Sequence, residues 1–407
     1  MNKHHPHNRV IIVGGSIAGL FAANLLHRSG WDVHVFERSV EDLQGRGAGI
    51  VTHPELVEAL ALAGITVNES FGVKVEKRVT IARDGLLVGT RDVAQVLTSW
   101  SRVYRLLRGA FPKERYHNGK HLTEFAQDEN GVQAQFADGD VVEADVLIGA
   151  DGLRSPIRQA ILPEVVPKYA GYVAWRGLVD EEQLSERVLT DIFPYFSFDL
   201  PPKEQMLAYP VAGLKNSTKP GKRRLNFVWY RPADEASTLM DMLRDDHGKV
   251  WPDGIPPPLI RQSVIKAARK AAHDVLSPQF AEVVAKTESL FFQPIFDLES
   301  QQIAFDRIAI LGDAAFVARP HCGMGVTKAA GDAVALARAL NANKSIEKGL
   351  LAYEKERMKV GGIIVDHARA LGAYMQAQIS TPAQKKRAEL YRTPEAVMRE
   401  TALPPPM

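Results

Sequence analysis

Cysteine is nearly absent from this chain of 407 residues, because Cys322 is its single cysteine. One thiol excludes an internal disulfide framework and a metal site built from cysteines alone, and it fits a reducing compartment. The chain has no apolar run long enough to cross a bilayer, and its start, MNKHHPHNRV, has no secretory apolar stretch. We expect a soluble, cytoplasmic protein in which His4, His5 and His7 belong to a solvated tail and no metal is bound.

An excess of charge of either sign is also missing. The 50 Lys and Arg residues against 48 Asp and Glu residues leave a formal net charge of +2, and the basic residues are scattered. Binding to nucleic acid or to an anionic membrane needs a concentrated basic surface, so we expect neither partner. Apolar residues make up 45% of the chain and charged residues 24%, which is typical of a soluble globular protein with a sizeable core.

A glycine-rich turn follows the first apolar segment. Residues 9–13 form a continuous apolar run, the next residues up to Gly30 have the apolar period of a helix, and residues 33–37 form a second apolar run. This order of strand, turn, helix and strand predicts the opening βαβ unit of a doubly wound parallel sheet.

The turn itself reads GGSIAG and stands where a dinucleotide fingerprint is expected. Gly14 permits the tight turn, the backbone near Ser16 approaches the pyrophosphate, and Gly19 lets the helix pack closely on the strand. The helix then begins at Ile17 and Ala18, whose free N–H groups would face the phosphates. Ser16 replaces the usual second glycine, so an ordinary strand-to-helix turn stays open as the alternative.

Glu37 ends the second strand, about 20 residues beyond the turn, where a carboxylate accepts hydrogen bonds from ribose hydroxyls. Arg38 beside it is expected to cover the adenine, with a surface charge pair as the alternative. Together with the turn, these residues predict a bound dinucleotide without deciding between NAD and FAD.

Two later segments each place an aspartate beside a glycine at the end of a buried strand. The first reads DVLIGADGLRSPIR and contains Asp151, and the second reads RIAILGDAA and contains Gly312 and Asp313. Such an aspartate can bind a ribityl hydroxyl or a phosphate-bridging group, while the glycine allows close approach of the backbone.

With these three motifs in order, the sequence resembles the class A flavoprotein monooxygenases, the para-hydroxybenzoate hydroxylase superfamily, over nearly its whole length. The resemblance implies bound FAD and NADH or NADPH as the transient reductant. It also implies that Asp313 contacts the ribityl chain, and that Asp151, Arg154 and Arg158 serve FAD and the nicotinamide cofactor.

The sequence departs from the common family pattern at Phe316, where many members have His, and at Thr327, where many have Asn. These departures resemble the branch that contains 2,6-dihydroxypyridine hydroxylase. The same is true of three stretches that read VARPHCGMGVTKA, GYVAWRG and NFVWYR, at residues 317–329, 171–177 and 226–231.

Two glycine-containing stretches resemble the parts of the family that hold the flavin ring. The first fits the movable loop that covers the isoalloxazine, and its residues are Arg46, Gly47, Ala48 and Gly49. The second would support the ring and direct the next helix N-terminus at flavin N1 and O2, and its residues are Pro320, Gly323, Met324 and Gly325.

The activity implied by the resemblance is hydroxylation of an electron-rich, hydroxylated aromatic or N-heteroaromatic ring with molecular oxygen, through a flavin C4a-hydroperoxide. Water must be kept out of such a site, so a dry apolar pocket is expected. An FAD-dependent oxidase, dehydrogenase or epoxidase of the same fold and a non-catalytic flavin-bearing binding protein remain the alternatives. The resemblance also makes a homodimer reasonable.

The residue that helps the substrate hydroxyl to ionise stays open among His321, Tyr209 and His53. His321 follows the proline on which the flavin ring should rest, Tyr209 lies on a strand expected to floor the pocket, and His53 follows the flavin loop. Each could instead have a purely structural role, for example Tyr209 as a tyrosine of the sheet whose hydroxyl is hydrogen-bonded within the protein. The expected aromatic pocket walls are Tyr195, Phe198, Tyr209 and Trp229.

The expected fold class is α/β. A Rossmann-like FAD-binding domain, residues 1–169 and 298–380 with a C-terminal helix, is interrupted by a mostly antiparallel substrate-binding domain at residues 170–297. Residues 122–148 alternate apolar and polar side chains between turn signals, which predicts a β-meander. Residues 381–407 are expected to be a tail, poorly ordered from Thr393 onward.

Overall fold

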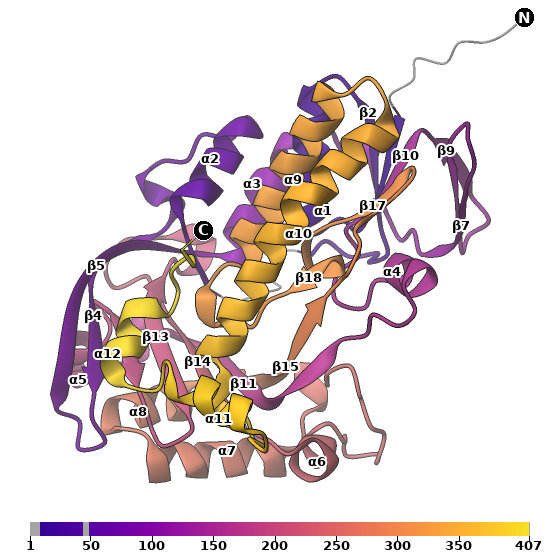
Figure 1. Cartoon of the computed structure of the whole chain (residues 1–407). Coiled ribbons are helices and arrows are strands. Elements are labelled where there is room, and N and C mark those ends of the chain that lie inside the picture. The colour runs from indigo at the N-terminus through magenta and orange to yellow at the C-terminus, as the bar shows by residue number, and fades with distance from the viewer. Residues whose placement is uncertain (1–8, 44–48, 407) are drawn as a thin grey trace, which may run out of the picture.

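A mostly parallel sheet, called here the parallel sheet, lies in the upper part of the molecule in Figure 1. In this computed structural model, which describes residues 9–43 and 49–406, its strand order is β16-β17-β10-β1-β2-β6. The strands are β1 (Arg9–Val13), β2 (Asp32–Glu37), β6 (Tyr116–Asn118), β10 (Val146–Gly149), β16 (Ala304–Phe305) and β17 (Ile308–Ile310). Only β16 pairs antiparallel among these described strands.

Helices cover the parallel sheet because its central strands are buried on both faces, as the continuous apolar run in β1 predicts. Helix α1 packs against α9, and α9 against α10 (Figure 1). The helices around this sheet are α1 (Ile17–Arg28), α2 (Pro54–Leu62), α3 (Trp100–Ala110), α4 (Pro156–Ile161), α9 (Gly325–Ala342) and α10 (Ile346–Leu371). The βαβ start and the return of the chain after residue 300 match the predicted α/β class.

The predicted meander is present as a small antiparallel sheet before β10. Its strands are β7 (Leu122–Gln127), β8 (Val132–Phe136) and β9 (Val141–Ala144). Turns at residues 128–131 and 137–140 separate the strands, where the sequence has its Asn-Gly and Asp-Gly pairs.

A second, mostly antiparallel sheet, called here the large sheet, has the order β18-β15-β11-β14-β13-β12-β4-β5-β3. Its strands are β3 (Gly49–Val51), β4 (Val73–Ile81), β5 (Leu87–Ser99), β11 (Lys168–Asp180), β12 (Phe196–Asp199), β13 (Gln205–Val211), β14 (Arg224–Pro232), β15 (Phe291–Glu299) and β18 (Phe316–Val317). Strands β3 to β5 precede residue 169, so the sheet extends beyond the segment expected to form the substrate-binding domain. Strand β12 of the later segment pairs in parallel with β4, which joins the two parts of the chain in one sheet.

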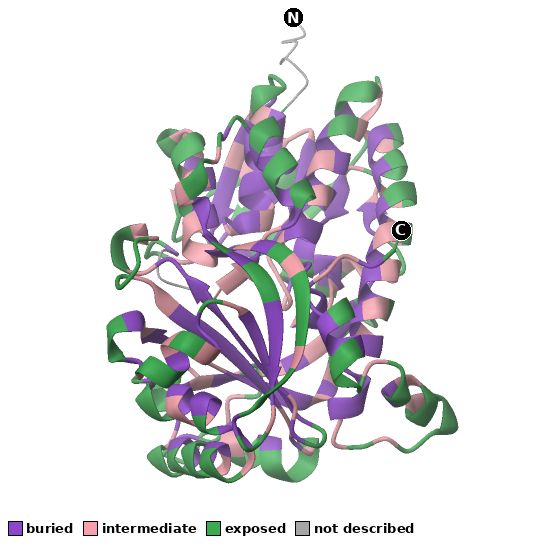
Figure 2. Cartoon of the chain, turned by 90° about the vertical axis from the view of Figure 1, so that its left-hand side faces the viewer, coloured by how far each residue is buried: buried purple, intermediate pink, exposed green. Residues whose placement is uncertain are grey.

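The two faces of the large sheet have different neighbours. One face packs on α5 (Glu186–Asp191), α6 (Met240–Met242), α7 (Gln262–Val275) and α8 (Pro278–Lys286), which form an apolar core with it. The other face is turned toward residues 373–402, and this side is called the inner face. Figure 2 shows the buried strands between these layers.

The C-terminal segment corrects the expectation of a poorly ordered tail. Residues 382–389 form α11 (Pro382–Glu389) beside α10, and residues 394–400 form α12 (Pro394–Glu400) beside β4 and β5 (Figure 1). Each helix starts with a capping Thr and a Pro, as at Thr393 and Pro394. Val397 and Met398 are buried in the core of the inner face. The Pro-rich ending hid this order, because the apolar residues that anchor it are few.

Among the described residues, no helix is long and apolar enough to span a membrane. No group of three or more His, Cys, Asp or Glu side chains within residues 9–43 and 49–406 is arranged to hold a metal ion.

Candidate active site

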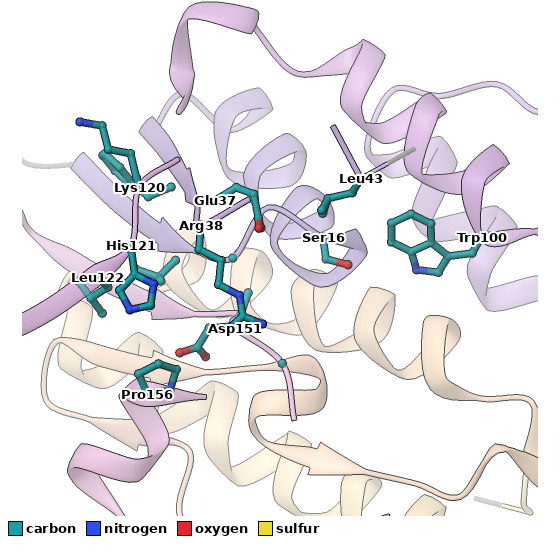
Figure 3. A pocket seen from close by; sticks show the side chains of 15 residues that line it. Ser16, Glu37, Arg38, Leu43, Trp100, Lys120, His121, Leu122, Asp151 and Pro156 are labelled. Carbon is teal, nitrogen blue, oxygen red and sulfur yellow. The ribbon is translucent and has the colours of Figure 1, made fainter. Parts of the chain in front are cut away.

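A pocket opens at the carboxyl ends of β1, β2 and β10, where ligands of doubly wound sheets bind (Figure 3). It brings together predicted residues from separate motifs, namely Gly14, Ser16, Glu37, Arg38 and Asp151. Trp100, Lys120 and His121 line it as well. The first turn, the end of the second strand and the first Asp-Gly pair therefore share one site.

The glycines of the first turn are required by close packing. Gly14 has φ +106°, and a Cβ there would lie 2.3 Å from the carbonyl oxygen of Ala150. A Cβ on Gly19 would lie 1.9 Å from the carbonyl oxygen of Gly14. The backbone of this turn can therefore lie directly on β10, which leaves its outer side for a ligand.

Glu37 is buried and fixes the shape of the pocket. Its carboxylate accepts hydrogen bonds from the amides of Gly15, at 2.8 Å, and Ser39, at 2.9 Å. Each carboxylate oxygen has a further lone pair, so Glu37 can still accept from ribose hydroxyls.

Asp151 and the start of α1 present unused polar groups to the pocket. Asp151 Oδ2 accepts from the amide of Ile157 at 3.2 Å, whereas its buried Oδ1 has no hydrogen-bond partner among the described residues. Burial raises the pKa of this carboxyl group. In the described part of the chain the Ser16 side chain makes no cap, so the first-turn amides of α1 stay available for an anion.

Asp313 lies in the second Asp-Gly segment, at the end of β17. Its side chain is accessible to solvent although protein surrounds it closely, and this desolvation raises the pKa of its carboxyl group. Gly312 has φ +64°, and a Cβ there would meet Ala18 at 2.7 Å. The buried Lys328 donates to the carbonyl oxygen of Gly312 at 2.8 Å and thereby holds this turn.

Arg154 and Arg158 have different surroundings, and only those of Arg158 disagree with the cofactor role that the resemblance implies. Arg154 pairs with Asp253 at 2.7 Å and lies over the ring of Phe296. Arg158 is fully buried, and its guanidinium donates to the carbonyl oxygens of Leu153, Val165 and Ala314. Arg158 therefore holds three backbone segments together in this structure, and its donors do not face the pocket.

The flavin-loop residues Arg46, Gly47 and Ala48 lie outside the described residues. Gly49 begins β3, and its amide donates to Asn226 Oδ1 at 3.0 Å. A Cβ on Gly49 would lie 2.8 Å from the hydroxyl of Tyr209. The end of this loop therefore lies directly against the inner face of the large sheet.

His321 is buried and both of its ring nitrogens have partners. Nε2 lies 2.8 Å from the hydroxyl of Tyr172, and Nδ1 lies 3.2 Å from Gln205 Oε1. Since an amide oxygen only accepts, Nδ1 carries the proton and Nε2 accepts from the tyrosine. Burial, with Arg319 and Arg176 nearby, holds the pKa of His321 well below its usual value, so the ring is neutral.

The histidine belongs to the short connection that leads into α9. The predicted residues of this connection are Pro320, Gly323, Met324 and Gly325, of which Gly325 begins the helix. Gly323 has φ +66°, which turns the chain into the helix. Gly325 is exposed, and a Cβ there would meet no described heavy atom within 4 Å, so there is room beside the first residue of α9. Buried Cys322 has its pKa raised to about 11 by desolvation, as expected of a packing thiol.

His53 has one ring nitrogen that makes no hydrogen bond of normal geometry to a described residue, although the backbone of Ala402 lies close to the ring. Its Nδ1 lies 2.9 Å from the hydroxyl of Thr327, and its buried Nε2 has no partner among the described residues. Burial lowers the pKa of His53, although the nearby backbone of Ala402 opposes this shift. Thr327, which departs from the common family pattern, thus orients a neutral imidazole.

Tyr209 and Phe198 both lie on the inner face. Tyr209 is buried and stacks on Phe196, with ring centroids 5.0 Å apart. Desolvation raises its pKa well above the usual value. Its strand partner is Asn226, whose buried Nδ2 has no partner among the described residues.

Trp229 does not fit the role of pocket wall. It is fully buried in the core between the large sheet and α7 and α8, and its indole donates to Glu204 at 2.8 Å. Side chains alternate between the faces of a strand, so Asn226, Val228 and Tyr230 face inward and Trp229 faces outward. Tyr195 is half-buried in the bend before β12, and no described contact brings it to the other candidates.

Comparison with known proteins agrees with this geometry. The family described as "FAD binding domain" matches residues 7–186 and 265–368, and "FAD binding domain-like" matches residues 169–297. The 2,6-dihydroxypyridine 3-monooxygenase of Paenarthrobacter nicotinovorans is 32% identical over 369 residues, 91% of this chain and 92% of the relative. The chain belongs to the class A flavoprotein monooxygenases.

A second relative and a solved structure match this chain over similar shares of their length. The 6-hydroxynicotinate 3-monooxygenase of Bordetella bronchiseptica is 26% identical and matches 81% of this chain and 82% of that protein. The structure of 2,6-dihydroxypyridine-3-hydroxylase from Arthrobacter nicotinovorans superposes with a TM-score of 0.85 at 31% identity, over 92% of this chain and 95% of that one. The chain is therefore an FAD-dependent enzyme.

The residues present fit FAD. The close-packed glycine turn, the uncapped start of α1, the Glu37 carboxylate and the unpartnered Asp151 Oδ1 suit an adenosine and a pyrophosphate. Gly312, beside Asp313, lies against Ala18 of α1, and Gly323, before α9, lies against Ala402 and Val51 of the inner-face core. A ribityl chain and a flavin ring would lie along this path.

Four residues of this monooxygenase site were missed by sequence reasoning, namely Tyr172, Arg176, Gln205 and Asn226. Tyr172, Arg176 and Asn226 stand in stretches that already resembled the family branch. The period of two alone places Gln205 on the same face of its strand as the candidate Tyr209, and Tyr172 on the same face of its strand as Arg176.

Proposed function

We propose that this monooxygenase hydroxylates a small hydroxylated N-heteroaromatic ring, such as a hydroxypyridine, with NADH or NADPH and O2. The observation that carries the proposal is the set of buried polar groups left without partners among the described residues, His53 Nε2, Asn226 Nδ2, Arg176 Nε and the hydroxyl of Tyr374. A ring with several heteroatoms could satisfy such groups, whereas a hydrocarbon ring would leave them unpaired. The full-length likeness to dihydroxypyridine and hydroxynicotinate monooxygenases supports the same substrate class.

Bound FAD would supply the acceptance of a hydride from NAD(P)H and the activation of O2. The protein must then bind and orient the ring, exclude water and take up the proton of the ring hydroxyl. His53 suits the last task because its Nε2 makes no hydrogen bond of normal geometry to a described residue and burial lowers its pKa, so that the ring is neutral and able to accept.

His321 has a different role in this proposal. Its two nitrogens are held by Tyr172 and Gln205, so the imidazole positions the Pro320–Met324 connection and does not itself accept the proton of the substrate. Tyr209, with its raised pKa, remains protonated and can donate to a ring oxygen or nitrogen.

The test is a screen of 2,6-dihydroxypyridine, 6-hydroxynicotinate and 4-hydroxybenzoate with the purified, FAD-loaded enzyme. We expect a hydroxypyridine to accelerate NADH or NADPH oxidation and one atom of ¹⁸O from ¹⁸O2 to appear in the product. The matched variants are His53→Gln and the exposed His273→Gln, of which only the first should lower kcat, by about 10² on general grounds.

Two results would contradict the proposal. Stoichiometric hydrogen peroxide with unlabelled product would indicate an oxidase of the same fold. Bound FAD with no ring compound that stimulates cofactor oxidation would indicate a flavin-bearing protein without turnover.

A further inference from the structure

The turn after α12 lies between the two histidines of the active site. The amide of Ala402 donates to the carbonyl oxygen of His321 at 2.7 Å. The backbone of Ala402 also acts on His53, whose pKa it raises against the effect of burial. A Cβ on Gly323 would lie 3.3 Å from the Cα of Ala402, so the turn touches the start of α9 as well.

Arg78 of β4 holds this turn. The guanidinium is fully buried, and Nη1 donates to the carbonyl oxygens of Met398 at 2.7 Å and Thr401 at 2.6 Å. Its Nη2 donates to Gln95 Oε1 at 2.6 Å, and Gln95 Nε2 donates to the carbonyl oxygen of Ala402 at 3.0 Å. A buried charge needs such acceptors, so the C-terminal carbonyl groups and Arg78 stabilise each other.

The same turn is tied to the polar network of the inner face. Gln205 Nε2 donates to Thr401 Oγ1 at 3.4 Å, while Gln205 Oε1 accepts from His321 Nδ1. Arg78 also lies over the ring of Phe196, 5.1 Å from its centroid, next to Tyr209. The C-terminal turn thus contacts both sides of the region where the substrate ring would bind.

Two observations distinguish this turn from a chain end that merely rests on the surface. Thr401 and Ala402 are 2% and 3% exposed. Ala402 also adopts φ +57°, a left-handed conformation that is unfavourable for a residue with a Cβ and persists only where its surroundings hold it.

We propose that residues 394–402 form the closing wall of the ring side of the active site, with Arg78 as the positioning residue that keeps the wall shut. This inference rests on the proposed function. With the wall in place, RH + NAD(P)H + H⁺ + O2 gives ROH + NAD(P)⁺ + H2O. With the wall displaced, water enters and O2 is reduced to hydrogen peroxide without hydroxylation of the ring: NAD(P)H + H⁺ + O2 gives NAD(P)⁺ + H2O2.

The test compares Arg78→Met and Arg78→Lys with the control Arg91→Gln. Arg91 is exposed and stands opposite Arg78 in the register of β4 and β5. In FAD-loaded Arg78→Met, amide hydrogen exchange of residues 394–402 should rise at least about tenfold, since each lost bond from a charged donor is a substantial fraction of local stability. Arg78→Lys should fall between, because an ammonium keeps the charge and loses the forked geometry.

The activity arm uses 2,6-dihydroxypyridine as the ring compound and measures NADH oxidation, hydroxylated product and peroxide together. For Arg78→Met we expect NADH oxidation to remain within a few-fold of wild type while most of the consumed O2 appears as peroxide. Arg91→Gln should keep the wild-type ratio of product to peroxide.

A second, milder variant tests the proposal even if Arg78→Met does not fold. Thr401→Val keeps the shape of the side chain and removes only the hydroxyl that accepts from Gln205. It should raise the peroxide fraction in the same direction and by less.

The two proposals fail in different ways. If no ring compound stimulates NADH oxidation in wild type, the proposed function fails at that point. If wild type is coupled and folded Arg78→Met is equally coupled, or if exchange of residues 394–402 is unchanged, the closing-wall proposal is overturned and the proposed function stands.

Discussion

The nucleotide end and the ring end of this active site are built in opposite ways. The nucleotide pocket takes most of its lining from short contiguous motifs at the ends of β1, β2 and β10. The inner face takes single side chains from β11, β13 and β14, and it is covered by the C-terminal segment some 170 to 230 residues away in the chain.

This difference follows from what each end recognises. Phosphates and ribose hydroxyls bind to backbone amides and one carboxylate, and that requirement fixes glycines and an acidic residue at set spacings. A substituted ring is recognised by side chains converging across a sheet, and their spacing in the sequence depends on connection lengths.

Gly14→Ala should weaken FAD binding more than any other change considered. The new Cβ would lie 2.3 Å from the carbonyl oxygen of Ala150 at φ +106°, and relief requires moving the turn off β10. We expect FAD to bind at least about a hundredfold more weakly, or roughly 3 kcal/mol, as measured by fluorescence titration. Gly109→Ala, where a Cβ meets no described atom within 4 Å, is the control and should bind FAD normally.

Tyr209→Phe and Trp229→Phe should separate the two faces of the large sheet. The first removes an inner-face hydroxyl and should lower kcat about 10- to 100-fold with FAD affinity retained. The second removes the bond to Glu204 on the helix-covered face and should lower the melting temperature with little change in kcat. Equal losses of kcat in both variants would contradict the assignment of faces.

Asp313→Asn should weaken FAD binding about tenfold, the loss typical of a charge-assisted hydrogen bond. The same change should raise the melting temperature of FAD-free protein at pH 7, since desolvation makes the ionised carboxylate unfavourable there. Calorimetry of the two FAD-free proteins checks this point. A lower melting temperature for the variant would show that the carboxylate stabilises the empty protein.

His321 should make stability depend on pH. Its folded-state pKa lies below the unfolded value of about 6.5, so its contribution is complete above that pH and is lost as pH falls, because only the unfolded chain then binds the proton. The free energy of unfolding should fall by up to about 1.4 kcal/mol per pH unit below pH 6.5 from this residue. His321→Asn should remove that slope, whereas His273→Gln, at an exposed position, should leave it intact.

Tyr209 and Trp229 show how far prediction from sequence could go at the ring end. Both are aromatic residues in apolar strands, and composition alone treats them alike. Their opposite roles depend on the register that pairs Tyr209 with Asn226 and Met206 with Trp229. Similarly, Arg158 stands in an Asp-Gly segment that resembles the family, yet its donors hold backbone carbonyl groups because its side chain turns inward.

Local patterns were enough to predict the α/β class, the βαβ start and the meeting of Gly14, Glu37 and Asp151 in one pocket, because backbone recognition of a dinucleotide imposes fixed spacing. Sequence patterns could not show which face each strand residue occupies, that both ring nitrogens of His321 have hydrogen-bond partners, or that residues 394–402 pack against Arg78. Those outcomes depend on contacts between residues far apart in the chain, whose geometry no local pattern carries.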